Sequence, residues 1–434
     1  MSRKFSPYTP DKTKIELDEK HFDLKKIIAL VLLVVAVTSI TYGVLTLLNK
    51  DPGWTTVEIT TDNSSSAEFV LNYKLGHAGI SPTAEHKKLA AVYKSAFEEA
   101  ERIFSDEYAV LEGGYDGFHA LNSHPNEKLT LAPALFDALL LLEENGVTLH
   151  LIAPICELYS GLCFSTTDEE AASNDPLIPT DTAEGTFSPS NYVKTITDFV
   201  KNGGVKLELD ANEKTAVLCV SEEYLAFADE YDIETFVSLG WMKNAFIVDY
   251  IAEKLTEEGF TCGNITSYDG FMRNLDEYKI GGEYSLNLYT RVENTVYPSA
   301  VVRYSGKMAA VTYRDYPMTN LDAGRYYTYA DGEERSIYVN PATGLYSPSA
   351  HEMTAYSAAS TCAAILVRTA GLYTLGLSEA ELAESLADLA SSDGIGSILS
   401  AGGYSLINNS PRGDVVLTDL YSKNGVSFTC GNNE

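Results

Sequence analysis

Positive charge is scarce in this chain of 434 residues, in which 31 lysines and arginines face 61 aspartates and glutamates and give a formal net charge of −30. So acidic a surface repels phosphate backbones, and the composition therefore disfavours a nucleic-acid partner. Cysteine is also sparse. The six cysteines form no CxxC pair, which argues against a cysteine metal cluster. We expect them to be small buried residues or to form one or two disulfide bridges.

The signatures of several large enzyme classes are missing. The sequence contains no GxSxG elbow, no GxxxxGK[ST] phosphate loop, no GxGxxG after a strand and no HExxH. The seven histidines are scattered, and we expect them to be surface or hydrogen-bonded residues rather than metal ligands. An apolar content of 45% is that of a globular protein, so a large folded domain is predicted.

One long apolar run stands near the N-terminus. Residues 27–48 carry no charge and, at about 1.5 Å per residue, can cross roughly 30 Å of hydrocarbon. The segment lacks a small-x-small cleavage site, so we predict an uncleaved transmembrane anchor, with a buried core helix as the alternative. Basic residues crowd the preceding tail, whereas only Lys50 follows closely. We therefore predict a cytoplasmic tail (1–26), a stalk (49–54) and an extracytoplasmic domain (55–434) at the cell membrane.

Helical and strand patterns are segregated in blocks along the predicted domain. Apolar spacing predicts helices at 84–104, 132–144, 191–202, 245–258, 354–370 and 378–389. Alternating patterns predict strands at 55–61, at 206–210 and 215–220, and in Tyr-rich and Val-rich runs between 284 and 340. The polar stretch 168–190 is predicted to be a surface insertion. This segregation indicates an α+β fold and disfavours a doubly wound nucleotide-binding sheet.

A series of short patterns carries a family resemblance. The segment VSLGWMKNAFIVDY (237–250) resembles the DLGGIAKGYAVD segment of the FAD:protein FMN transferases, the ApbE family. Four further patterns follow the family's order: LIAPICELY (151–159), TYRDY (312–316), GRYYTYADGEERSIYVNPATG (324–344) and YSAAST (356–361), the last expected on a helix. The resemblance extends from about residue 55 to 427. It implies an ApbE-like, T-fold-like domain with antiparallel sheets flanked by helices.

The resemblance also implies a ligand site. By position in the motifs, the cofactor-binding residues would be Lys243, Asp249, Gly270, Tyr316, Asn340, Pro341 and Gly344. Ser357, Thr361 and the backbone carbonyl of Met242 would hold magnesium. FAD and Mg²⁺ are then the expected cofactors, and an exported flavoprotein is the expected acceptor of FMN. Read without the family, Lys243 is one exposed lysine at the start of a helix.

Departures from the family motifs fall on polar positions. Ser357 stands where the family has a metal-binding aspartate, and a neutral hydroxyl is a far poorer ligand than a carboxylate. Asn244 replaces the glycine after the lysine, and Ile337 replaces the motif histidine. Three hypotheses follow: an active transferase, a homologue that binds a ligand or partner without catalysis, and a resemblance of fold alone. A pocket that joins Lys243, Asn340, Ser357 and Thr361 would favour the first.

Overall fold

A computed structural model describes residues 38–39, 52–61, 64–106, 116–179, 187–292, 295–319, 322, 324–400, 406–409, 415–417 and 430–431. The chain divides into two compact units, 1–52 and 53–434. The predicted anchor at 27–48 lies almost wholly outside the described residues and stays a prediction. Within the described ranges, no helix combines the length and apolarity needed to cross a membrane.

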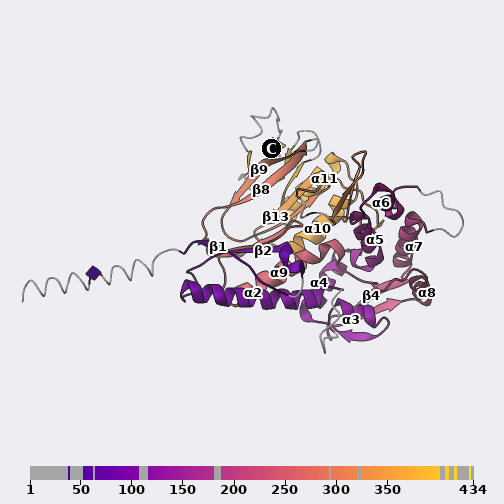
Figure 1. Cartoon of the computed structure of the whole chain (residues 1–434), viewed down its shortest axis with the longest axis horizontal. Helices are drawn as coiled ribbons and strands as arrows, with labels where there is room; N and C mark the ends of the chain where they lie inside the picture. Colours follow the sequence, from indigo (N-terminus) through magenta and orange to yellow (C-terminus); the bar gives the residue numbers. More distant parts are fainter. Residues whose placement is uncertain are drawn as a thin grey trace, which may run out of the picture. The chain divides into compact units, whose positions relative to one another are not determined.

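A large sheet forms the centre of the second unit (Figure 1). The described residues place nine strands in it, and neighbours are antiparallel except for the last pair. In spatial order the strands are β1 (Trp54–Val57), β2 (Phe69–Lys74), β6 (Gly263–Ser267), β7 (Phe271–Asn274), β10 (Met308–Arg314), β13 (Glu352–Ser357), β14 (Gly396–Ser400), β15 (Leu406–Asn408) and β17 (Cys430–Gly431).

Alternate residues of a strand point to opposite faces of a sheet, and in this sheet both faces are covered. Val311 joins the main core, which also contains the apolar residues of α2 (Pro82–Phe104), α9 (Lys243–Glu257) and α10 (Cys362–Thr374). Its neighbour Ala310 joins a smaller core on the other face. A second sheet of β16 (Val415–Leu417), β9 (Thr295–Tyr304) and β8 (Tyr284–Val292) covers that face.

The remaining elements surround this centre, and Figure 1 shows α5 to α8 gathered at the end away from β8 and β9. Two small sheets are β3 (Lys128–Thr130), β5 (Thr215–Val220) and β4 (Val205–Asp210), and the hairpin β11 (Tyr326–Thr328) with β12 (Glu334–Ser336). The other helices are α3 (Phe118–Ser123), α4 (Pro133–Glu144), α5 (Ala153–Cys163), α6 (Asp168–Asn174), α7 (Pro189–Lys201), α8 (Glu222–Glu230) and α11 (Glu379–Ser392). Short 3₁₀ turns are η1 (Ser64–Glu68), η2 (Leu149–Leu151) and η3 (Gly240–Met242).

The predicted α+β class is confirmed, and one local prediction is wrong. The helix expected at 354–370 begins only at Cys362, because Glu352–Ser357 form the central strand β13. All six strand residues are buried, so the alternation that marks a half-exposed strand is missing. The YSAAST segment consequently spans a strand end and a turn rather than a helix. Within the predicted insertion 168–190, residues Asp168–Asn174 form α6, capped by Thr167 and rich in acidic residues in its first turn.

The cysteines that the structure describes bear out the expectation of small buried residues. Cys163, Cys262 and Cys362 are buried, and Cys156 and Cys219 are half-buried. Cys156, Cys163, Cys219 and Cys362 are free thiols.

Gly270 fixes the turn between β6 and β7. Its φ is +102°, and an added Cβ would lie 2.3 Å from the carbonyl oxygen of Thr312 on β10. We expect Gly270→Ala to lower the free energy of unfolding by about 3 kcal/mol, from backbone strain together with the clash. The matched control is Gly332, which also follows an aspartate in a turn, has a φ of +92° and has open space around it.

The control isolates the strain of the positive φ, so Gly332→Ala should lower stability by only about 1 kcal/mol. Urea unfolding of both variants measures the difference. Equal losses in the free energy of unfolding would show that the close approach of Gly270 to β10 does not contribute to the effect of the substitution.

Candidate functional site

A cleft of about 340 Å³ lies at the N-terminal end of α9. Its walls come from the end of η1, one side of α5, η3, the β6–β7 turn and the segment that precedes β11. This volume is at the lower end of the range for small-molecule pockets, roughly 300–1,000 Å³. The cleft therefore has room for a compact ligand or for one part of a larger one.

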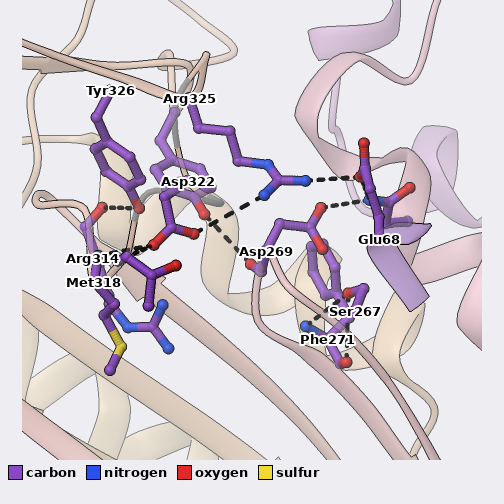
Figure 2. Close-up of polar contacts among 12 residues, drawn as sticks. Glu68, Ser267, Asp269, Phe271, Arg314, Met318, Asp322, Arg325 and Tyr326 are labelled. Carbon is purple, nitrogen blue, oxygen red and sulfur yellow. Dashed lines mark hydrogen bonds and ion pairs between the residues drawn. The ribbon is translucent and has the colours of Figure 1, made fainter. Parts of the chain in front are cut away.

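One guanidinium and one amide link the carboxylates of this cleft (Figure 2). Arg325 Nη2 donates to Glu68 Oε2 at 2.7 Å, and Arg325 Nη1 lies 4.0 Å from Asp322 Oδ1. Asn244 Nδ2 donates to Glu68 Oε2 at 3.0 Å and to Asp269 Oδ2 at 2.8 Å. These bonds join η1, α9, the β6–β7 turn and the start of β11 into one polar network, which we call the carboxylate network.

Asp269 is the most deeply buried carboxylate that lines the cleft. It is 7% exposed, and its Oδ1 has no hydrogen-bond partner. Burial raises the pKa of this carboxyl above its usual value, and the nearby charge of Arg325 opposes that rise. An unpaired acceptor at this depth is unfavourable in the free protein, so the position is suited to a donor from a ligand.

Lys243 is the predicted site residue that lies in this cleft. It is the first residue of α9, and among the described residues its ammonium has no hydrogen-bond or ion-pair partner. Met242, immediately before it, is fully buried in η3. Gly240 begins η3 with a φ of +51°, and a Cβ there would lie 2.8 Å from the sulfur of Cys156. This close packing against α5 sets the position at which α9 and Lys243 begin.

Asp249 lies one and a half turns further along α9, where protein donors surround its carboxylate. Oδ1 accepts from the backbone amide of Cys362 at 3.0 Å and pairs with Arg273 Nη1 at 2.7 Å. Oδ2 accepts from the amide of Ala363 at 2.8 Å. The side chain thus caps the N-terminus of α10 and ties both helices to β7.

The NPATG segment forms a buried turn. Asn340 is 2% exposed, donates to the carbonyl of Thr374, and accepts from the amides of Ala342 and Thr343. The carbonyl of Pro341 accepts from Thr148. Gly344 has a φ of +65° and packs against side chains of α5 and α7. The turn therefore joins α5, α7 and α10.

Tyr316 belongs to a second buried network. Its hydroxyl donates to Glu352 Oε2 at 2.6 Å, and Arg314 Nε lies 3.6 Å from the same oxygen. Burial raises the pKa of the Glu352 carboxyl, and the charge of Arg314 opposes that rise. Tyr313 and Arg314 stand where the resemblance has serine and glycine; Tyr313 is fully buried and the Arg314 side chain is 16% exposed.

The predicted metal-binding hydroxyls are engaged locally. Thr361 is the N-cap of α10 and accepts from the amide of Ala364. Ser357 ends β13, is 3% exposed and accepts from the amide of Ala359. Within the described ranges, neither these residues nor Asn340 lines the cleft with Lys243.

The oxygen ligands available at the predicted metal site do not fit a magnesium ion. Magnesium requires hard oxygen ligands, usually with at least one carboxylate, in octahedral geometry. Ser357 and Thr361 are neutral, and Asp249 already makes three bonds to protein donors. Across the part of the chain that the structure describes, no three His, Cys, Asp or Glu side chains are arranged to hold a metal ion.

Apart from Lys243, the residues that line the cleft were not predicted as site residues, among them Glu68, Trp241, Asp269 and Arg325. Asp269 stands beside Gly270, which the family resemblance had singled out, and an Asp-Gly pair is a turn signal, so the sequence contained a signal for it. Glu68 ends a short 3₁₀ turn more than 170 residues before Asn244, and no local pattern marks that contact.

Comparisons with solved structures identify the fold. No protein-family model and no curated protein sequence matches the chain. The ApbE protein from Thermotoga maritima is similar in structure with a TM-score of 0.54 and 11% identity, over 85% of this chain and 98% of that one. The flavin transferase ApbE from Vibrio cholerae has a TM-score of 0.47 and 13% identity, over 82% and 94%.

The flavinyl transferase ApbE of Pseudomonas stutzeri has a TM-score of 0.44 and 12% identity, over 85% of this chain and 95% of that one. The Thermotoga comparison establishes the ApbE fold for this domain. The predicted resemblance is thereby confirmed as a shared fold.

Asp249 provides a test of structural against ligand-binding roles. We expect Asp249→Asn to lower the free energy of unfolding by about 3 kcal/mol, because it leaves Arg273 buried without its carboxylate and weakens the cap of α10. Thermal and urea unfolding measure the loss. Lys243→Ala, at the half-buried start of the same helix, is the control and should change stability by less than about 0.5 kcal/mol, because among the described residues the ammonium has no partner. Equal stability of Asp249→Asn and the unchanged chain would contradict a structural role.

Proposed function

We propose that this domain is a non-catalytic protein of the ApbE fold, which binds a small ligand in the cleft at the start of α9 and does not transfer FMN. The observation that carries the proposal is the state of Asp249, whose carboxylate is bonded to two amides of α10 and to Arg273. Ser357 stands at the aspartate position, and Asp249, the carboxylate that the described residues place at the start of α10, is already bonded to protein donors. Transfer from a diphosphate would then lack the Lewis acid that magnesium supplies to the phosphoryl oxygens.

The proposal of ligand binding rests on the cleft itself. A concave site with convergent polar groups and a carboxyl of raised pKa is a favourable candidate for a binding site. Among the described residues, neither Asp269 Oδ1 nor the Lys243 ammonium has a hydrogen-bond partner, and both line the cleft. Both are therefore available to a ligand. The use of FAD and Mg²⁺, expected from the resemblance, belongs to the alternative of an active transferase. The following assay tests that alternative.

The assay mixes the full-length chain in detergent with FAD, Mg²⁺ and an acceptor peptide that carries a [DS]GA[TS][ST] pattern. We expect AMP release and peptide labelling at the level of a protein-free sample. The Vibrio cholerae flavin transferase, run in parallel, shows that the assay detects transfer. Magnesium-dependent AMP release that is lost in Lys243→Ala would overturn the proposal and support the alternative, an active transferase that uses Lys243 at the phosphates.

We also propose that residues 27–48 anchor the chain in the cell membrane with the domain outside. The support is the uncharged apolar run and the crowding of basic residues before it. The full-length chain should stay with membranes after alkaline carbonate extraction, and a chain that lacks residues 27–48 should not. Protease added to intact cells should digest the domain. Digestion only after lysis would contradict the orientation.

A further inference from the structure

The cleft has an excess of negative charge. Among the described residues, four acidic side chains line it, Glu68, Asp106, Glu157 and Asp269, against two basic ones, Lys243 and Arg325. The guanidinium of Arg325 is also shared, because it contacts Glu68 and lies near Asp322, which does not line the cleft. Among the described residues, the lining of the cleft therefore carries more negative than positive charge.

The donors that contact the carboxylates are already in use, whereas the Lys243 ammonium and Trp241 Nε1, which also line the cleft, have no partner among the described residues and do not bond to Asp269. Both N–H groups of Asn244 are used, one on Glu68 and one on Asp269 Oδ2. Arg325 is directed to Glu68 and Asp322 (Figure 2). Asp269 Oδ1 consequently remains a buried acceptor without a partner, in a side chain that lines the cleft. A ligand that donates to this oxygen would remove an unfavourable group from the free protein.

Aromatic rings line the same cleft. The Trp241 ring is held edge-on by Tyr338 at 5.2 Å and by Tyr313 at 6.0 Å. Phe164, just after α5, is 69% exposed, and its ring covers Gly324, where a Cβ would lie 2.5 Å from Cζ. The exposed face of Phe164 can attract a cation or a flat apolar group, whereas Trp241 is 5% exposed and presents only part of its ring to the cleft.

From these observations we infer that the ligand of this cleft is a small organic cation, an amidinium or a primary ammonium on a flat apolar body. Its N–H donors bond to Asp269 Oδ1, its charge offsets the acidic excess, and its body packs on Trp241 and Phe164. The inference rests on the proposed function, in that it assigns a ligand class to the cleft proposed there.

The test measures binding of three probes of the same shape to the full-length chain by calorimetry at low salt. The probes are benzamidine, which is cationic, benzamide, which is neutral, and benzoate, which is anionic. We expect benzamidine to bind at least about tenfold more tightly than benzamide, with weakening at high salt, and benzoate to bind least. Equal affinities, tighter binding of benzoate, or no binding of any probe would overturn the inference.

Variants locate the site. Asp269→Asn preserves shape and removes the charge and the free acceptor, so it should weaken benzamidine binding by about tenfold or more. Asp198→Asn makes the same charge change on α7, outside this cleft, and should leave binding unchanged. Circular dichroism checks folding. Should Asp269→Asn fail to fold, Glu68→Gln tests the same network and should also weaken binding. Full affinity in a folded variant of either residue would contradict the assignment.

The outcomes separate this inference from the proposed function. Magnesium-dependent FMN transfer would overturn the proposed function whatever the probes do. Absence of transfer together with no preference for the cationic probe would overturn the ligand class alone.

Discussion

The carboxylate of Asp249 is the contact on which the arrangement of helices and sheet depends. It lies on α9, accepts from two amides at the start of α10, and pairs with Arg273 on β7. A buried ion pair is strongly unfavourable once one partner is missing, because the other charge stays desolvated. One side chain therefore fixes the position of two helices over the middle of the central sheet.

This constraint determines which chemistry the two helix termini can support. The amides at the N-terminus of α10 are satisfied by Asp249 and by its own cap Thr361, so that terminus offers no free donors to a phosphate or to a ligand's carboxylate. The start of α9 differs, since Lys243 has no partner among the described residues and Asn244 faces the carboxylate network. Available polar groups are thus concentrated at α9, away from Ser357.

The sequence was most informative where local patterns decide structure. The periodicity of 84–104 predicted α2 to within two residues, and the alternation around 206–220 predicted the β4–β5 hairpin. Strand β13 was missed because a central strand with both faces buried lacks a period, and α6 was missed because a short acidic helix resembles a polar loop. The motif order predicted the fold and placed Lys243 in a cleft. It did not predict Glu68 beside Asn244, since that contact arises only from the pairing of β2 with β6.

Asn244 connects the departure from the family motif with the charge of the cleft. The resemblance has a glycine at this position, which leaves the backbone open to close approach by a phosphate. The asparagine side chain instead fills that space and holds Glu68 and Asp269 on its two N–H groups. Two charges about 4 Å apart near a protein surface interact by roughly 4 kcal/mol at an effective dielectric constant of 20. A diphosphate beside these carboxylates meets repulsion that one lysine does not offset, whereas a cation meets attraction. The carboxylates that Asn244 holds, rather than the neutral asparagine itself, carry the charge that favours a cation in the proposed cleft.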